Sequence, residues 1–467
     1  MLFNSLEFLF IFLPIIIFLN YYLNKKNIFL SKILLIISSL VFYALWNIKL
    51  LPLLIFSILI NYYISNILVR TQNDELKKKY LICGIMLNII ILGLFKYTNF
   101  FIENFNYIFV SNIGLLNLIF PLGLSFYTIQ QISYLIDCSE GEIKKTNLIK
   151  YFTFVSFFPQ LIAGPIILYK DFLRQFKNLN NNKKHKYFLG LIIFTIGLSK
   201  KVLIADTLQL YVDENFLNLK LLNVYELILT SYSFTFQIYY DFSGYTDMAI
   251  GLGLLFGIKF PNNFNRPFVS KSMIEFWRRW HITLSKFIQI YIYQKIVSKF
   301  HNLNIYNSSI TIIFVMFLAG IWHGPTWMYA LFGLAHGLGI AVNYFWKTYC
   351  FKLPNFLNWL ITFNFVNFTF IIFRSENLDQ FKIFINNIFD INMYTQKKIE
   401  VYNIDAGIIV LLILILISTF KFENSENIIL KKNFTYKKII FFGFITSVSI
   451  LKMLLSLKSN SFVYFDF

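Results

Sequence analysis

Charged side chains are scarce in this chain. They make up 14% of its 467 residues, well below the roughly 25% of an ordinary soluble protein, and the acidic ones number only 23. Cysteine is scarcer still, because Cys83, Cys138 and Cys350 are far apart and no Cys-x-x-Cys occurs. The composition therefore argues against a soluble globular fold, and the cysteines support neither a zinc ribbon nor a disulfide framework.

Several common catalytic motifs are also missing. There is no Gly-x-Ser-x-Gly elbow and no phosphate-binding Gly-x-x-x-x-Gly-Lys loop, which argues against a serine hydrolase and against a P-loop pump. Neither His-x-x-x-His nor His-Glu-x-x-His occurs, so a zinc site would need ligands from separate helices. We expect no bound metal and no bound cofactor.

Long apolar runs fill the sequence instead. Hydrophobic residues make up 57% of the chain, the mean hydropathy is +0.61, and a helix needs about 20 mostly apolar residues to cross a bilayer. We therefore predict an all-α polytopic membrane protein, a single domain over residues 1–467 with roughly ten to twelve transmembrane helices. The first run lacks a basic segment before it and a cleavage site, so we expect it to remain as a span. The runs are Leu6–Leu23, Ile33–Trp46, Leu50–Val69, Tyr80–Phe95, Phe363–Phe373 and Ile408–Phe420.

The net charge of +19 predicts membrane topology rather than a nucleic-acid partner. Its basic residues cluster in short loops, and such loops stay in the cytoplasm. The N-terminus, with no lysine before Lys25, is then expected outside. The loops expected inside are 24–32, 70–79, 347–355 and 422–438. Abundant Ile, Phe, Lys and Asn indicate an AT-rich bacterial genome.

The apolar runs of the segment 151–346 are more often interrupted than those of the flanking segments. Its apolar runs are interrupted by Pro, Gly, Asn and charge, and irregular backbone at membrane depth survives only where protein or water surrounds it. We expect broken or re-entrant helices around a cavity there, with ordinary scaffold spans in 6–136 and 355–456. Phe157–Pro165, which contains Gln160, has two prolines six positions apart and is predicted to be broken or kinked.

Two further interruptions carry charge. Asp241 and Asp247 precede a glycine-rich stretch, where they cap a helix starting near Met248, line a polar cavity or pair with arginine. The segment 272–299 alternates aromatic and charged residues and is predicted to be an interfacial or re-entrant helix. On it, helical spacing places Trp277, His281, Leu284 and Ile288 on one face and makes Glu275 and Arg279 an i,i+4 ion pair. Contact of Arg278 and Arg279 with phospholipid head groups is the alternative for these two arginines.

Two histidines lie in the apolar sequence that follows. The helix expected from about Ser308 stops at Trp322-His323-Gly324-Pro325 after about 15 residues, short of the roughly 20 needed to cross, which predicts that His323 lies below the far membrane surface. His336 stands between Gly333 and Gly337, whose spacing allows two helices to approach closely. It is either a functional residue or a buried histidine that locks those helices together. An ionisable residue at membrane depth is by default a functional candidate, and a neutral histidine there suits general-base catalysis of acyl transfer.

Five motifs in order resemble the bacterial membrane-bound O-acyltransferases, nearest to the alginate and peptidoglycan O-acetyltransferase subfamily. They are Phe157–Pro165, Asp241–Gly251, Asn263–Pro267, Glu275–Ser285 and Gly320–Gly324. The resemblance implies that His323 is catalytic and that His281 is the second active-site histidine. It implies a central tunnel by which acetyl from cytoplasmic acetyl-CoA crosses the inner membrane, and a separate extracytoplasmic partner of the SGNH type that completes transfer to a polysaccharide. Around the two histidines we expect a supporting polar core of Gln160, Asp241, Asp247, Arg278, Arg279, Trp322 and His336.

The acceptor is open at this level. Peptidoglycan is favoured because nearly all bacteria have it; alginate, another exopolysaccharide, or D-alanyl transfer to teichoic acid are the alternatives. A transporter or lipid flippase with a midplane polar site is an alternative from another class. A non-catalytic assembly platform, in which the histidines only pack helices, is a third.

Overall fold

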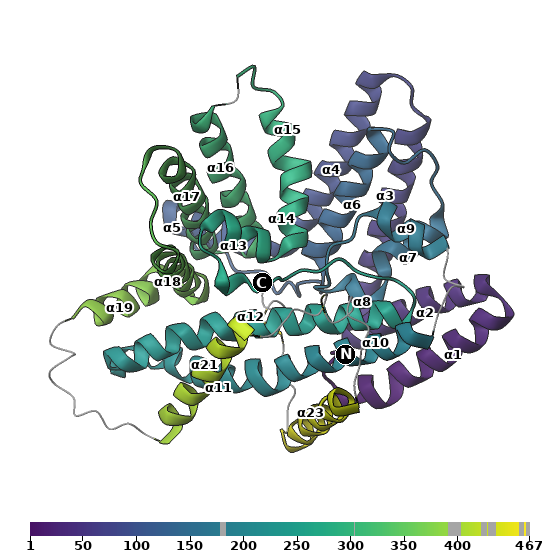
Figure 1. Ribbon diagram of the computed structural model, residues 1–467. Coiled ribbons are helices and arrows are strands. Elements are labelled where there is room, and N and C mark those ends of the chain that lie inside the picture. Colours follow the sequence, from purple (N-terminus) through teal and green to yellow (C-terminus); the bar gives the residue numbers. More distant parts are fainter. Residues whose placement is uncertain are drawn as a thin grey trace. The chain divides into compact units, whose positions relative to one another are not determined.

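The computed structural model describes residues 1–177, 184–302, 304–390, 403–421, 427, 436–456 and 462–463. Every regular element in these ranges is a helix, and none of them contains a strand (Figure 1). The chain forms two compact units that interleave along the sequence. The first unit comprises mainly Met1–Leu198, Tyr245–Pro261 and Lys437–Phe465, and the second mainly Ser199–Gly244 and Asn262–Tyr436.

The first unit holds the N-terminal helices. They are η1 (Phe8–Phe12), α1 (Leu13–Lys26), α2 (Ile28–Asn47), η2 (Ile48–Leu50), α3 (Leu51–Arg70), α4 (Asp74–Lys96), α5 (Thr98–Phe109), α6 (Leu124–Ser139), α7 (Leu148–Ser156), α8 (Phe158–Leu161), α9 (Tyr169–Lys177), α10 (Lys184–Ser199) and, from the far end of the chain, α23 (Tyr436–Leu455). Asparagines begin several of these helices, since Asn27, Asn73 and Asn147 each accept a backbone N–H of the first turn.

The second unit holds the elements that carry the candidate histidines. They are η3 (Lys200–Ala205), α11 (Asp206–Leu217), η4 (Leu219–Leu221), most of α12 (Val224–Leu255), η5 (Pro267–Val269), α13 (Met273–Arg279), α14 (Ile282–Ile288), η6 (Gln289–Tyr293), α15 (Gln294–Val297), α16 (Ile305–His323), α17 (Trp327–Tyr349), α18 (Asn355–Arg374), α19 (Leu378–Phe389) and α21 (Asn403–Lys421).

Among the described residues, seven helical segments are long and apolar enough to cross a membrane, which confirms the prediction of an all-α polytopic membrane protein. The first predicted span is present as η1 and α1. The total of ten to twelve passes stays a prediction, as does the single domain, and most of the expected cytoplasmic loop 422–438 lies outside the described residues. The seven segments are Phe8–Lys26, Ile28–Arg70, Asp74–Lys96, Tyr187–Leu217, Ile305–His323, Trp327–Tyr349 and Asn355–Arg374.

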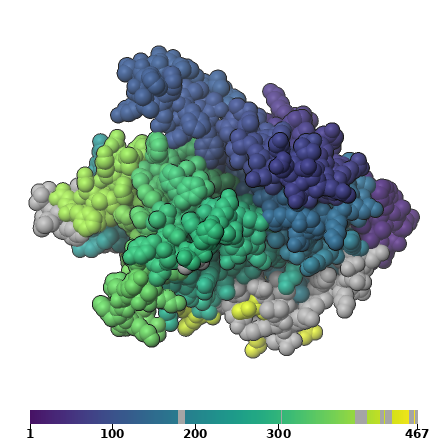
Figure 2. Space-filling model, turned by 90° about the horizontal axis from the view of Figure 1, so that it is seen from above, coloured from purple at the N-terminus to yellow at the C-terminus, as the bar shows by residue number. Residues whose placement is uncertain are grey.

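Large apolar side chains lie on the outside of these helices. Phe18, Tyr63 and Ile90 are exposed on α1, α3 and α4. Figure 2 shows α5 and the loop after it as a blue lobe, where Tyr107 and Val110 are almost fully exposed. An apolar surface of this kind is suited to contact with lipid tails rather than water.

The prediction of broken helices in the segment 151–346 is confirmed at its first interruption, Phe157–Pro165. Helix α7 ends at Ser156, the one-turn α8 carries Pro159 in its first turn, and no helix follows until Tyr169 begins α9. Proline is tolerated in a first turn because the N–H it lacks would have no partner there.

Helix α12 rules out one of the alternatives for Asp241 and Asp247. It runs for 32 residues without a break, so Asp241 and Asp247 lie in its interior and do not cap a helix near Met248. The weakest helix former between the two carboxylates is Gly244, which costs about 1 kcal/mol and is outweighed by packing.

Helix α16 contradicts the expectation of a helix of about 15 residues before His323. It begins at Ile305, where the Asn304 side chain accepts the N–H of Asn307, and it ends at His323 after 19 residues. At 1.5 Å per residue this is about 28 Å, close to the thickness of the hydrocarbon core. His323 therefore stands at the end of a nearly full-length helix, and the argument that a short helix keeps it deep is wrong.

Candidate active site

The chain around His281 is not the continuous helix that its spacing predicted. Helix α13 ends at Arg279, Trp280 is extended, and His281 has a left-handed backbone with φ of 42° before α14 starts at Ile282. The expectation that Trp277 and His281 share one helix face is therefore wrong. The break is held by two backbone hydrogen bonds, from Asn265 N–H to Arg279 C=O and from Ile282 N–H to Asn263 C=O, both 2.9 Å.

Asn263 also holds the ring of His281. Its Oδ1 lies 3.2 Å from His281 Nδ1, 3.2 Å from Thr283 N and 2.8 Å from Thr283 Oγ1. His281 is completely buried, and the Phe242 ring of α12 packs edge-on against it with centroids 4.8 Å apart. His281 lies outside the candidate membrane spans, and burial lowers the pKa of its ring well below the ordinary value, so the ring is neutral at physiological pH.

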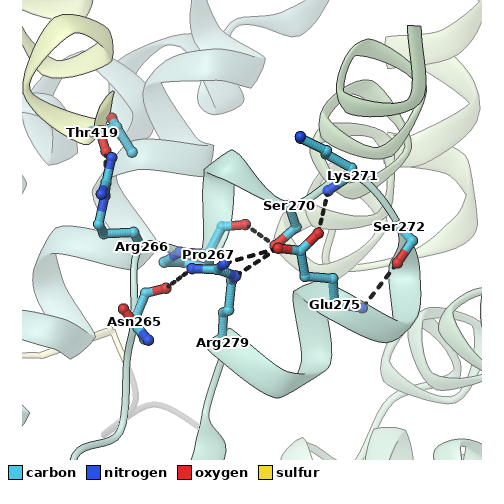
Figure 3. Close-up of polar contacts among 9 residues, drawn as sticks. All are labelled: Asn265, Arg266, Pro267, Ser270, Lys271, Ser272, Glu275, Arg279 and Thr419. Atoms are coloured by element: carbon cyan, nitrogen blue, oxygen red, sulfur yellow. Dashed lines mark hydrogen bonds and ion pairs between the residues drawn. The ribbon is translucent and has the colours of Figure 1, made fainter. Parts of the chain in front are cut away.

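The loop before α13 is tied to that helix by the Glu275 carboxylate (Figure 3). Glu275 accepts the Lys271 N–H at 2.9 Å and pairs with the Arg279 guanidinium at 2.9 Å, which confirms the predicted i,i+4 pair. Arg279 also donates to the Asn265 carbonyl oxygen at 3.2 Å, and Ser272 caps the first turn. Arg279 thus braces the backbone on which His281 stands. Arg278 is exposed, so its place in the polar core stays a prediction.

His323 is buried at the junction of α16 and α17. Its ring lies 6.0 Å from Phe332, 5.6 Å from Phe373 and 5.1 Å from the half-buried Trp322, between centroids. Helices α16 and α17 lie side by side (Figure 1). Glycines of the two helices face each other where the helices pack together. A Cβ on Gly320 would come within 2.7 Å of the Gly333 Cα, which confirms the close approach expected at Gly333.

His336 connects α17 to α13. Its Nδ1 accepts a hydrogen bond from the Trp277 indole N–H at 3.2 Å, and its side chain is completely buried. This geometry agrees with the interpretation of His336 as a histidine that locks helices together.

One aromatic cluster contains all three histidines. Phe332 contacts both His323 and His336, with the latter only 4.4 Å away between ring centroids. From His336 the ring contacts continue to His281 through Phe276, Trp280, Phe264 and Phe242. Within the second unit the fold thus surrounds three imidazoles with aromatic walls.

The sequence analysis missed a buried lysine. Lys201 is completely buried in the π-helix η3, where its Nζ lies 2.6 Å from Asp241 and 2.9 Å from Asp206. Arginine was the partner considered for Asp241, and the structure pairs this carboxylate with a lysine. The available signal was a lysine within the apolar stretch after residue 187, where a charge at membrane depth needs a partner.

The remaining predicted residues belong to the first unit. Asp247 is buried on α12, and Gln160 is completely buried in α8 and donates to the Phe154 carbonyl oxygen. Their participation in the site stays a prediction.

Comparison with known proteins identifies the relatives of this arrangement. Residues 40–375 match the MBOAT, membrane-bound O-acyltransferase family. The chain belongs to the membrane-bound O-acyltransferase family. The match spans Lys201, the Asn263–Thr283 contact and all three clustered histidines, so every element of the aromatic cluster lies within the family's part of the chain.

Three relatives in this family illustrate its range. The chain is 41% identical to the peptidoglycan O-acetyltransferase of Helicobacter pylori, over 81% of this chain and 78% of the relative. It is 39% identical to the probable alginate O-acetylase AlgI of Pseudomonas aeruginosa, over 81% and 73%. It is 30% identical to the teichoic acid D-alanyltransferase of Bacillus subtilis, over 56% and 70%.

Proposed function

We propose that this protein is a membrane O-acetyltransferase that moves an acetyl group from cytoplasmic acetyl-CoA, across a bacterial inner membrane, to an extracytoplasmic polysaccharide. The observation that carries the proposal is the burial of His323 and His281 in one aromatic cluster within the region that matches the acyltransferase family. An imidazole withdrawn from bulk water and kept neutral is suited to proton transfer during acyl transfer.

His323 is the general base in this proposal. Its imidazole takes the proton of the acceptor hydroxyl while the hydroxyl oxygen attacks the acetyl carbonyl carbon. The new C–O bond forms, the thioester C–S bond breaks, and the proton passes from the imidazolium to the departing thiolate of coenzyme A. The step needs no redox partner. Trp322, Phe332 and Phe373 wall the ring and limit its rotation.

Peptidoglycan is the acceptor that we propose. The relative with 41% identity is named for peptidoglycan O-acetylation, whereas the relatives named for alginate and teichoic acid are 39% and 30% identical. Alginate, another exopolysaccharide, and D-alanyl transfer to teichoic acid are the alternatives within the same chemistry.

The route and the partner belong to the same proposal. A central tunnel lets the donor arrive from the cytoplasm and the acceptor, or a carrier of the acetyl group, arrive from outside. A separate SGNH-type protein beyond the membrane completes the transfer to the polysaccharide. The N-terminus lies outside, as the basic loops 24–32 and 70–79 on the cytoplasmic side require.

Mass analysis of wall sugars tests the proposal. Cells that lack the gene, and cells that carry His323→Ala at unchanged protein level, are expected to lose the acetylated sugars, while His301→Ala, at an exposed histidine, keeps them. Unchanged acetylation in the deletion strain would exclude peptidoglycan as the acceptor. Intact acetylation in the His323→Ala strain would instead favour an assembly platform or a transporter over an enzyme.

A further inference from the structure

Three groups converge on the side-chain oxygen of Asn263. The Thr283 N–H lies 3.2 Å from Oδ1, the Thr283 hydroxyl 2.8 Å, and His281 Nδ1 3.2 Å. Asn263 and His281 are completely buried and Thr283 almost so, and their contacts all lie within the second unit. The three residues therefore form one buried polar arrangement inside the aromatic cluster.

The backbone N–H of Thr283 determines which way the Asn263 amide points. An N–H group can only donate, so the atom facing it must be the amide oxygen and not the amide nitrogen. An oxygen of this kind can only accept, so His281 Nδ1 must be the nitrogen that carries the hydrogen. Because the ring is neutral, its other nitrogen, Nε2, carries a free lone pair.

That lone pair has no hydrogen-bond partner among the residues that the structure describes. His281 Nε2 is fully buried and makes no hydrogen bond, although a buried polar group left unsatisfied costs about 1–3 kcal/mol. The backbone of His281 is also held in the left-handed region at φ of 42°, which a residue other than glycine rarely adopts. Strain and an unsatisfied group at one buried residue are typical of a binding or catalytic position.

We propose that Asn263 is a positioning residue that fixes His281 as its Nδ1–H tautomer, so that Nε2 accepts a hydrogen bond from an O–H or N–H group of the bound substrate. This inference rests on the proposed acyl transfer. Two groups have the required chemistry, the hydroxyl of the acceptor sugar and an amide N–H of the pantetheine arm of the donor. The edge-on ring of Phe242 limits the rotation of the imidazole, so that Nε2 keeps one direction.

Steady-state kinetics of Asn263→Ala and His281→Asn test the inference. Asparagine tolerates the left-handed backbone and keeps a polar group near Asn263, but it has nothing at the Nε2 position. Both variants are expected to lower kcat/KM by about 10- to 100-fold, the factor that corresponds to one lost hydrogen bond at a buried group. A raised KM for acetyl-CoA in His281→Asn identifies the donor amide, and a raised KM for the sugar identifies the acceptor hydroxyl.

Asn263→Asp supplies a readout that a purely structural role would not change. A carboxylate accepts from Nδ1–H equally well but favours the imidazolium, whose Nε2 has no lone pair. Activity should then be low in acid and recover as the pH rises, with its acid limb displaced upward from that of the wild type. Neighbours of the ring include Phe242 and Thr283, which do not titrate in this range.

Asn262→Ala is the matched control. The side chain of Asn262 donates to the Phe264 carbonyl oxygen, so its loss should leave the kinetics unchanged. If Asn263→Ala has wild-type kinetics, or if the pH profile of Asn263→Asp superimposes on that of the wild type, the inference is wrong. His323→Ala in the same membranes distinguishes this failure from failure of the proposed function. If His323→Ala is inactive, the proposed acyl transfer stands although the inference is wrong. If His323→Ala is active, the proposed acyl transfer is wrong as well.

Discussion

The Trp277 indole donates a hydrogen bond of 3.2 Å to Nδ1 of His336 and thereby joins α13 to α17. An indole N–H can only donate, so Nδ1 of His336 is unprotonated and, in the neutral ring, the hydrogen is on Nε2. His281 has the opposite tautomer, because the atom that faces its Nδ1 can only accept. Two buried histidines of one aromatic cluster thus have opposite tautomers. Nε2 is buried without a hydrogen-bond partner among the described residues in both rings, but it is an acceptor in His281 and a donor in His336.

Trp277→Phe removes the donor and leaves a buried nitrogen unpaired. The free energy of unfolding should fall by about 1–3 kcal/mol, measured as thermal or denaturant stability of the purified protein in detergent. Trp346→Phe is the control, since that indole donates to the Phe351 carbonyl oxygen at a more exposed position. Equal losses in the two variants would contradict the locking role of His336.

Gly320→Ala should separate α16 from α17. The added Cβ would lie 2.7 Å from the Gly333 Cα, and backbone cannot move aside as a flexible side chain can. We expect a lower yield of folded protein and a lower melting temperature, measured by size-exclusion chromatography and a thermal scan. Gly93→Ala in α4 meets no atom within 4 Å, so it should be neutral or slightly stabilising. A fully stable Gly320→Ala would show that the two backbones do not approach this closely.

Lys201→Met should be strongly destabilising. It leaves Asp241 and Asp206 without their buried cation, and removal of one partner from a buried ion pair costs about 3–5 kcal/mol. The double variant Lys201→Met with Asp241→Asn should recover part of this loss, because one of the two stranded charges is then gone. Denaturant unfolding in detergent measures the effect. Lys382→Met, whose partner Asp379 is exposed, should change nothing measurable, and a similar loss there would contradict the argument.

Much of the architecture follows from the sequence because the thickness of the bilayer sets the length of a spanning helix. Apolar runs of about 20 residues can only be helices in lipid, which is why the spans were predicted. Helix boundaries were harder. The apolar run predicted a start near Ser308, but α16 begins three residues earlier, at Ile305, where Asn304 caps it. The added residues make the helix long enough to cross a membrane. A hydropathy profile gives no information about a residue that caps a helix.

The interior breaks depend on contacts between distant residues. The stretch from Met273 to Ile288 has the spacing of one helix, yet it is interrupted at His281 because the backbone of Asn263 and Asn265 pairs with it. Conversely, the polar run at Asp241 looks like a helix start but is absorbed into α12, since Lys201 neutralises the carboxylate from another element.

The candidate site was predicted only in part, because some of its contacts also join residues that are distant in the sequence. His281 and His323 were predicted because a histidine in apolar sequence is conspicuous, and Glu275 and Arg279 because their spacing is local. Asn263 and Lys201 were not assigned roles, since their partners lie 18 to 40 positions away. Pairings at that distance are set by the fold and leave no local pattern.

The rate of acetyl transfer in isolated membranes tests the role of His323 most directly. Membranes with equal amounts of wild-type protein, His323→Ala and His301→Ala receive acetyl-CoA labelled in the acetyl group together with the polysaccharide acceptor. Loss of a general base lowers a rate by about 10²- to 10⁴-fold, so His323→Ala should fall by at least about 100-fold while His301→Ala keeps the wild-type rate. A wild-type rate in His323→Ala would contradict the account.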